Sequence, residues 1–314
     1  MNSSQLSIVV CTRNRPILLN KLLTSIEKSP LKPLEVIIIS SGEEISEIIS
    51  NHKNSFEIKY FHTTQIGQSN QKKIAFEYLD KKSRWVFFLD DDLEIISTTL
   101  DTAIKCITEV EELSISGIGT CLVSSADNPI FPWKLFSNQL VHLKKGKIKK
   151  SGKATKYMYG RKIETEWLNG ASIWRKSALI NYDLPILHSR YAAYEDVIFS
   201  SNVAKNSKLI YEPKIKVIEQ TNHSLLSINL DQFKYITLWT GYLVCKRKHT
   251  RLRNFKILTI TRSMRFIFKT VKNKSNFNLK TLLLFVSQIL QLPNNKNYAE
   301  AIIIEMIKKE SSSN

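Results

Sequence analysis

Three short, fully apolar segments recur in the N-terminal part of the chain, and they constrain its fold more than any other feature. The segments are Leu6–Val10, Val36–Ile39 and Trp85–Leu89, and stretches with helical spacing of apolar residues separate them. A strand that is apolar on both faces is typical of a parallel sheet covered by helices on both sides. The sequence therefore predicts an α/β fold whose first part is a doubly wound, nucleotide-binding type of half-domain.

Beyond this half the pattern is mixed. A helix is expected at 98–113, and strand-like segments follow at 118–123, 139–143, 172–174 and 211–218. Residues 197–205 and most of 231–310 have helical spacing. We expect one α/β domain to about residue 230, followed by a helical extension.

Positive charge is concentrated at the C-terminal end. The chain has 46 Lys and Arg against 28 Asp and Glu, a net charge of +18, and residues 231–314 carry +12 of it. The 68 residues from Gln232 to Ala299 contain no acidic side chain. This excess indicates an anionic partner: a phosphate-bearing substrate, a nucleic acid or an anionic membrane surface.

The cysteines and the apolar segments place limits on the cellular setting. Cys11, Cys106, Cys121 and Cys245 are far apart in the sequence, which favours neither a zinc site nor a disulfide framework. No apolar run reaches the roughly 18 residues of a spanning helix, and the N-terminus lacks the pattern of a signal peptide. We expect a cytoplasmic protein that can lie on a membrane.

Three consecutive acids, Asp90, Asp91 and Asp92, directly follow the apolar strand Trp85–Leu89. Ligands of parallel sheets bind at the carboxyl ends of the strands. Adjacent carboxylates repel one another unless a cation shares them, and Mg²⁺ or Mn²⁺ would do so together with diphosphate oxygens. The alternative is an acidic loop that only caps the next helix.

Two further motifs carry candidate chemistry. Glu195-Asp196 precedes a predicted helix, so either acid could be a first-turn cap stabilised by the helix dipole, or a general base. Asn169-Gly170 is a turn signal that either closes a hairpin or lets a substrate approach the backbone closely.

Taken together and in order, these motifs resemble those of the family 2 glycosyltransferases of the GT-A fold. The resemblance runs from about Leu6 to His223 and rests on the segments LSIVVCTRNRP, EVIIISSG, QIGQSNQKKIAFEYLDKKSRWVFFLDDD, WLNGASIWRKSAL and YAAYEDVIFS. It implies a mixed, mostly parallel sheet flanked by helices, with a nucleotide-sugar-binding half at 1–115, an acceptor half at 116–230 and a basic helical extension at 231–314.

The resemblance also implies roles for individual residues. Asp196 would be the general base with Glu195 beside it, and Asp92 would hold the metal with Asp90 and His223. The donor would be bound by Thr12, Asn14, Arg15, Ser40, Lys72, Asp90, Asp91, Asn169, Gly170 and Ala171.

Two positions depart from the family pattern. Ser40-Ser41 stands where the family usually has acids that contact the nucleotide base, and a hydroxyl cannot accept two donors as a carboxylate does. Lys72-Lys73 stands where an Arg-Asn pair is frequent, which keeps positive charge but loses bidentate geometry.

The implied reaction is an inverting, Mn²⁺- or Mg²⁺-dependent transfer of a sugar to a hydroxyl. The donor would be a nucleoside-diphosphate sugar, UDP-sugar first among them. The acceptor would be a glycan or a lipid-linked molecule of bacterial surface polysaccharide or glycolipid synthesis.

Two other functions fit part of the sequence. A nucleotidyltransferase also pairs a parallel sheet with metal-binding acids, but the glycine-rich loop that often follows its first strand is missing here. A non-enzymatic basic protein that binds nucleic acid or a membrane would explain the charge and leave the acids unexplained. The sequence has no nucleic-acid-binding motif, so we expect no nucleic acid partner.

The segment between Lys246 and Lys274 has 11 basic residues, no acid and interleaved apolar residues. We expect it either to lie on an anionic membrane, as a peripheral attachment to the inner face of the cytoplasmic membrane, or to pack its apolar residues internally while its charges stay in water.

Overall fold

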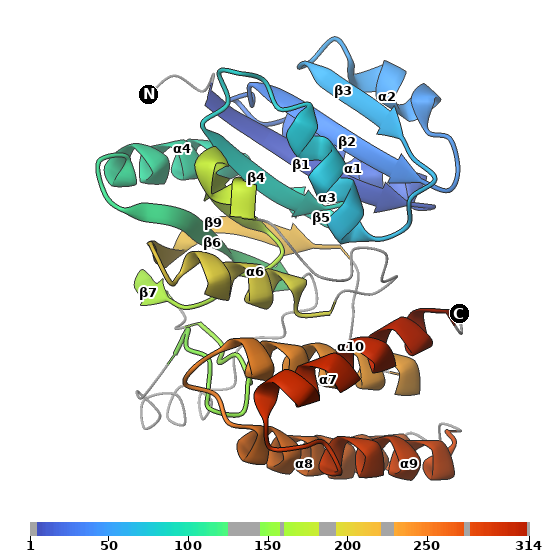
Figure 1. The fold of residues 1–314 in the computed structure, drawn as a ribbon. Helices are drawn as coiled ribbons and strands as arrows, with labels where there is room; N and C mark the ends of the chain where they lie inside the picture. The colour runs from blue at the N-terminus through green and yellow to red at the C-terminus, as the bar shows by residue number, and fades with distance from the viewer. Residues whose placement is uncertain are drawn as a thin grey trace. The chain divides into compact units, whose positions relative to one another are not determined.

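The computed structural model describes residues 5–124, 145–157, 160–181, 193–220, 229–272 and 277–312. The chain forms two compact units. Unit 1 comprises Met1–Lys147, Lys156–Pro185 and Asp196–Asn222, and unit 2 comprises Ile148–Thr155, Ile186–Glu195 and His223–Asn314. Unit 1 contains the sheet, and unit 2 contains the C-terminal helices (Figure 1).

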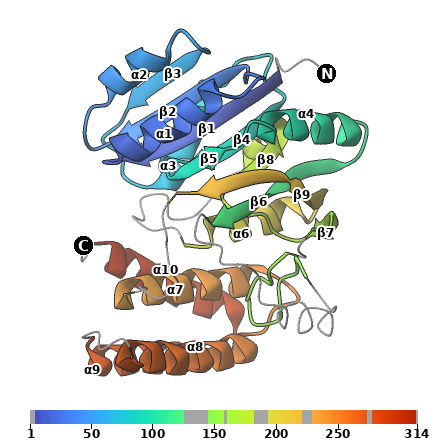
Figure 2. The same cartoon turned by 180° about the vertical axis from the view of Figure 1, so that it is seen from behind.

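A mixed sheet of nine strands forms the centre of unit 1 (Figures 1 and 2). The strand order is β3-β2-β1-β4-β8-β6-β9-β5, and β7 pairs with β9. Strands β3, β2, β1 and β4 are parallel, whereas β8 runs antiparallel to both β4 and β6. The strands are β1 (Leu6–Arg13), β2 (Glu35–Ser41), β3 (Ile58–His62), β4 (Trp85–Asp90), β5 (Leu93–Ile95), β6 (Ile115–Ser124), β7 (Ile163–Thr165), β8 (Ser172–Arg175) and β9 (Lys208–Glu219).

Helices cover both faces of this sheet, as the fully apolar strands predict. Alternate residues of β1 enter different cores: Ile8 and Val10 pack with α1, α2 and α4, whereas Val9 packs with α3 and α6. The helices of unit 1 are α1 (Pro16–Glu27), α2 (Ser46–His52), α3 (Gln68–Glu77), α4 (Thr99–Val110), the 3-10 helix η2 (Lys176–Asn181) and α6 (Glu195–Val203).

Most predicted elements are confirmed, but the hairpin alternative at Asn169-Gly170 is wrong. The flanking strands do not pair with each other, because β7 pairs with β9 while β8 pairs with β4 and β6. The strand expected at 139–143 lies outside the described residues. Cys11, Cys106, Cys121 and Cys245 form no disulfide with one another.

The described residues of unit 2 include four helices in two layers (Figures 1 and 2). Helix α7 (Leu230–Lys246) packs with α10 (Lys296–Ser312), and α8 (Leu252–Lys272) packs with α9 (Leu279–Leu290). Asn229 and Gln232 form a reciprocal capping box that fixes the start of α7. Gly241 of α7 leaves room for Phe255 of α8, since a Cβ at Gly241 would lie 2.8 Å from its ring. None of the described helices has the length and apolar character needed to span a bilayer.

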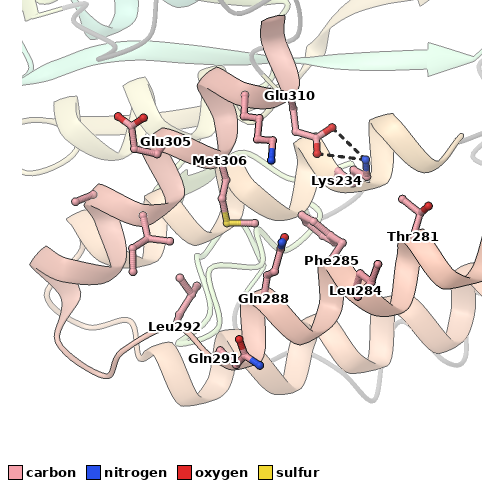
Figure 3. Close-up of a pocket in the computed structure, with 13 residues that line it drawn as sticks. Lys234, Thr281, Leu284, Phe285, Gln288, Gln291, Leu292, Glu305, Met306 and Glu310 are labelled. Atoms are coloured by element: carbon pink, nitrogen blue, oxygen red, sulfur yellow. Dashed lines mark hydrogen bonds and ion pairs between the residues drawn. The ribbon is translucent and has the colours of Figure 1, made fainter. Parts of the chain in front are cut away.

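The helices of unit 2 also line an open cavity of about 880 Å³ (Figure 3). Its lining comes from α7, α9 and α10, and an ion pair of 3.1 Å between Lys234 and Glu310 lies at one side. Phe285 and Met306 contribute apolar surface. No residue that the sequence singled out for chemistry lines this cavity.

A buried carboxylate joins the early strands of unit 1. Glu35 is fully buried at the start of β2 and accepts hydrogen bonds from the Ser7 hydroxyl at 2.7 Å and the Asp80 backbone N–H at 2.9 Å. Its other oxygen pairs with Lys59 Nζ of β3 at 2.6 Å. One side chain therefore holds β1, β2, β3 and the loop before β4 in register.

We predict that Glu35→Ala lowers the free energy of unfolding by about 3 kcal/mol, because buried donors lose their acceptor and Lys59 loses its partner. Urea unfolding followed by circular dichroism measures the change. Glu57→Ala is the matched control: this exposed acid lies 3.9 Å from the same Lys59, and its loss should cost less than about 1 kcal/mol. Equal effects of the two substitutions would contradict the role given to Glu35.

Candidate active site

The candidate site lies at the carboxyl ends of β1, β2 and β4. The parallel register pairs Thr12 with Ser40 and Cys11 with Asp90, so the three strands end at the same edge of the sheet. Residues from three separate sequence motifs thereby become neighbours. This is the edge at which parallel sheets bind their ligands.

Asp91 is the middle residue of Asp90–Asp92, which we call the acid loop. It accepts a hydrogen bond of 2.7 Å from the Thr12 hydroxyl and one of 3.0 Å from Arg15 Nη1, and it is almost fully buried. Burial raises the pKa of Asp91 above its usual value, while the contacts with Thr12 and Arg15 oppose the rise. Thr12 and Arg15 are predicted to line a nucleotide pocket. In the structure they also hold the acid loop in place through Asp91.

Arg15 also contacts a second acid while part of its side chain stays exposed to solvent. The same Nη1 lies 3.4 Å from Asp92 Oδ2, and the side chain of Arg15 is 45% exposed. The N-terminus of α1 follows directly, with Pro16 in its first turn, where a proline is tolerated. The Arg15 guanidinium therefore offsets part of the negative charge of Asp91 and Asp92, and part of its surface remains accessible to solvent.

Asn14 and Gly42 join the ends of β1 and β2. Asn14 has a left-handed backbone (φ 53°), and its Oδ1 accepts a hydrogen bond of 2.9 Å from the Glu43 N–H. Gly42 has φ 92°, and a Cβ at this position would lie 2.0 Å from Asn14 Oδ1. Only glycine fits this close approach.

Ser40 is buried at the end of β2. Its hydroxyl lies 3.0 Å from Tyr60 Oη and 3.1 Å from His62 Nδ1 of β3, and Tyr60 donates in turn to Glu44 Oε1 at 2.7 Å. Tyr60, His62 and Glu44 were not predicted as site residues. Glu44 supplies an exposed carboxylate near the position where the family pattern has its acids, and its place shortly after Ser40-Ser41 was the signal for it.

Helix α3 contributes two amides that the sequence analysis also missed. Gln68 Nε2 donates to Asp90 Oδ1, and Gln71 Nε2 donates to the backbone oxygens of Thr12 at 2.9 Å and Ile39 at 3.2 Å. Lys72 is buried, and its Nζ lies 5.0 Å from the centroid of the Phe88 ring. Its approach to a diphosphate stays a prediction.

The segment 168–171 connects the acid loop to α6. A Cβ on Gly170 would lie 3.1 Å from Asp90 Oδ2, so this carboxylate faces the Gly170 backbone. The Leu168 N–H donates to Ser200 Oγ of α6 at 2.9 Å. Thr120 Oγ1 donates to the Ala171 carbonyl oxygen, which fixes the end of the segment.

The side-chain amide of Asn169 is hydrogen-bonded through its nitrogen but not, among the described residues, through its oxygen. Its Nδ2 donates to the Thr120 carbonyl oxygen at 3.0 Å. Its Oδ1 is buried and accepts no hydrogen bond from the described part of the chain. A buried acceptor left without a donor is costly, so this oxygen is suited to a donor group of a ligand.

Asp196 lies in the first turn of α6. Its Oδ1 accepts a hydrogen bond of 2.8 Å from the Val197 N–H. Tyr157 stacks on Trp167 at 4.5 Å, and burial, with a smaller contribution from the negative charge of Asp196, raises the pKa of Tyr157 well above its usual value. Glu195 is buried beside Asp196 in sequence. The helix start is thus occupied by acids, as the sequence indicated.

The end of β9 reaches the acid loop from the other side. The Gln220 N–H donates to the Asp92 carbonyl oxygen at 2.8 Å, and its Nε2 donates to the Leu93 carbonyl oxygen at 3.0 Å. The predicted ligand His223 follows three residues later in the sequence and lies outside the described residues.

The acids fit a divalent cation that takes most of its ligands from a substrate. Among the described residues, no three Asp, Glu, His or Cys side chains form a ready metal cage. Mg²⁺ and similar cations commonly use one or two carboxylates together with phosphate oxygens. Asp92 and Asp90 are the carboxylates that would serve such a cation, and Gly170 has no side chain that would crowd Asp90 Oδ2.

Residues 7–139 match the family model described as Glycosyl transferase family 2. This part of the chain is a glycosyl transferase family 2 domain. The chain is therefore a glycosyltransferase. It is 25% identical over 312 residues to the GalNAc(5)-diNAcBac-PP-undecaprenol beta-1,3-glucosyltransferase of Campylobacter jejuni, with 93% of this chain and 94% of that protein covered.

Solved structures share the fold of this glycosyltransferase. S. aureus TarS 1-349 in complex with UDP-GlcNAc matches with a TM-score of 0.59 at 15% identity, over 98% of this chain and 91% of that one. The mannosyltransferase PcManGT from Pyrobaculum calidifontis in complex with GDP-Man and Mn²⁺ matches with a TM-score of 0.56 at 11% identity, over 98% and 86%. The transferase has the expected GT-A fold with C-terminal helices added.

We predict that Gly42→Ala destabilises the transferase by about 2 kcal/mol, because the new Cβ must expel the Asn14 side chain in addition to straining the backbone. Gly160→Ala is the matched control, since Gly160 also has a positive φ (69°) but nothing lies within 4 Å of its Cβ position. We expect about 1 kcal/mol for this control in the same urea unfolding experiment. Equal losses would show that the Asn14 contact adds nothing.

Proposed function

We propose that this glycosyltransferase carries out an inverting, metal-dependent transfer of a sugar from a nucleoside-diphosphate sugar to a hydroxyl of a glycan or lipid-linked acceptor. Residues 1–230 would form the transferase domain, with residues 1–115 for the donor and 116–230 for the acceptor. The observation that carries the proposal is the segment 168–171, which contacts Asp90 through Gly170 and α6 through Leu168. The segment thus contacts both Asp90 and the helix that carries Asp196, the residues to which we assign metal binding and proton uptake.

The donor would bind across the ends of β1 and β2. The cluster of Ser40, Tyr60 and Glu44 offers hydroxyl and carboxylate groups to a nucleotide base or ribose. A UDP-sugar is our first candidate, because the TarS structure of the same fold holds UDP-GlcNAc. Asn169 Oδ1, which is buried and accepts no hydrogen bond from the described residues, would accept one from a sugar hydroxyl.

Asp92 and Asp90 would hold Mn²⁺ or Mg²⁺ beside the diphosphate, and His223 would add a further ligand. The cation supplies charge neutralisation for the leaving nucleoside diphosphate. Arg15, within 3.4 Å of Asp92 and partly exposed, would attract the same phosphates. Asp91, held by Thr12 and Arg15, would keep the loop in shape.

Asp196 would act as the general base. The acceptor hydroxyl gives its proton to the Asp196 carboxylate while its oxygen forms a bond to the anomeric carbon of the sugar. The bond from that carbon to the diphosphate oxygen breaks on the opposite face, and the nucleoside diphosphate leaves with the electron pair. Glu195, next to Asp196 in the sequence, would add a second negative charge at the N-terminal end of α6.

The acceptor proposal draws on the Campylobacter jejuni relative, whose name specifies a PP-undecaprenol-linked glycan. A lipid-linked acceptor stays in the plane of a bilayer. We therefore infer that the transferase works as a peripheral protein at the cytoplasmic face of a membrane. The net charge of +18 would attract it to anionic lipids.

Nucleotidyl transfer is the rival reaction at such a site. A thermal-shift panel of nucleotide sugars with Mn²⁺ or Mg²⁺ would find the donor, and the product formed with it separates the two reactions. Glycosyl transfer releases a nucleoside diphosphate, whereas nucleotidyl transfer releases pyrophosphate.

We predict that Asp196→Asn lowers the rate of nucleoside diphosphate release at least about 100-fold, because the amide cannot take up the acceptor proton. Asparagine keeps an Oδ1 that can accept from the Val197 N–H, so donor binding by thermal shift should stay unchanged. Asp101→Asn, a change to an exposed acid of α4, is the control and should react at the wild-type rate. Wild-type turnover of Asp196→Asn would remove this residue from the base role.

We predict that Asp92→Ala abolishes the part of the donor-induced thermal shift that requires Mn²⁺, because one of two carboxylate ligands is lost. The wild-type protein should lose the same part of the shift on addition of EDTA. Glu94→Ala, two residues along on β5, serves as the control and should retain it. A wild-type shift that is identical with and without EDTA would contradict the metal site.

A further inference from the structure

Helix α8 has an apolar face that the described residues leave exposed. Its buried face is formed by Leu252, Phe255, Thr259, Ser263 and Thr270, and Phe255 packs against Gly241 of α7. A second set of large apolar side chains on the same helix is exposed. We call this set the α8 stripe: Ile257, Ile260, Met264, Phe268 and Val271.

The members of the α8 stripe lie on one side of the helix. Their spacing of three or four residues repeats the helical period over about 21 Å at 1.5 Å per residue. At 3.6 residues per turn the stripe lies about 140° around the helix from the buried face. Met264 is 65% exposed, Phe268 71% and Val271 68%. Rows of large exposed apolar side chains mark surfaces that meet another apolar phase.

Basic residues accompany the stripe. Arg253, Lys256, Arg265, Lys269 and Lys272 alternate with its apolar members along α8. No acidic residue occurs anywhere between Gln232 and Ala299, so acids of this segment cannot neutralise them. The neighbouring α9 adds the exposed leucines Leu279, Leu283, Leu284 and Leu290.

This combination selects one kind of partner. A second copy of the chain would bring like-charged helices together, which is unfavourable. A nucleic acid would meet the positive charges and leave the apolar side chains in water. The interface of an anionic bilayer satisfies both, since lipid headgroups pair with Lys and Arg while the apolar side chains enter the boundary with the acyl chains.

We infer that the α8 stripe, with the basic residues beside it, inserts into the interface of an anionic membrane. Helix α8 would then lie parallel to the membrane plane, with its other face packed on α7. The inference deepens the proposed function, because it names the surface that brings the enzyme to a lipid-linked acceptor. Its test uses vesicles that contain neither donor nor acceptor, and so it can fail independently of the transfer reaction.

The test is co-sedimentation of the full chain with vesicles of phosphatidylcholine alone or mixed with phosphatidylglycerol. The wild-type protein should bind the mixed vesicles, and binding should weaken as NaCl screens the charges. Replacing two cations, Arg265→Gln with Lys272→Gln, should reduce the partition coefficient about 25-fold. The control is Lys81→Gln with Lys82→Gln in unit 1, which should bind like the wild type.

The apolar members are tested by Met264→Gln with Phe268→Gln, which should weaken binding at least about tenfold. Ile17→Gln, a change to a 74% exposed residue of α1, is the matched control. Circular dichroism spectra and a midpoint of thermal unfolding equal to those of the wild type would show that each variant is folded. Because both substitutions replace exposed side chains, we expect no loss of stability.

Three results would overturn the inference. One is equal binding to neutral and anionic vesicles, and another is wild-type binding by both α8 variants. The third is a concentration-dependent dimer in light scattering that the Met264→Gln, Phe268→Gln variant loses, without vesicle binding by the wild type. That outcome would assign the stripe to a second copy of the chain.

Discussion

The parallel pairing of β1 with both β2 and β4 is the constraint on which the candidate active site depends. It aligns Thr12 with Ser40 and Cys11 with Asp90 at one edge of the sheet. Each strand is apolar on both faces and must be covered by helices, so polar side chains can only collect where the strands end. The candidate active site therefore lies in the turns after the strands, while the apolar side chains of the strands form the core.

The carboxylates of Asp90, Asp91 and Asp92 repel one another at this edge, and contacts with other side chains offset part of the repulsion for each. Asp91 is buried and held by Thr12 and Arg15, and Asp90 receives the Gln68 amide. Asp92 has the partly exposed Arg15 at 3.4 Å. Three acids that follow one another in the sequence thus have different contacts: Thr12 and Arg15 for Asp91, Gln68 for Asp90 and Arg15 for Asp92.

Much of the fold and of the site followed from local patterns. The apolar runs predicted β1, β2 and β4, the helical spacing between these runs predicted the helices that connect them, and the order of the motifs indicated the glycosyltransferase family. The amides of Gln68 and Gln71 and the cluster of Tyr60 with Glu44 were missed. Their importance comes from contacts between residues distant in sequence, which no local pattern encodes.

The sequence by itself determined that the N-terminal part of the chain has a nucleotide-binding type of α/β fold. The spacing of apolar residues along each segment specifies whether it is a helix or a strand, and a strand that is apolar on both faces must be covered by helices on both sides. Only the tertiary structure decided which polar groups meet. It showed that Asn169-Gly170 closes no hairpin and that Gly170 instead faces Asp90. It also separated Phe255, which is buried, from Phe268, which is exposed. Both are apolar residues of α8, and burial depends on the helix packed opposite, which the sequence of one helix does not contain.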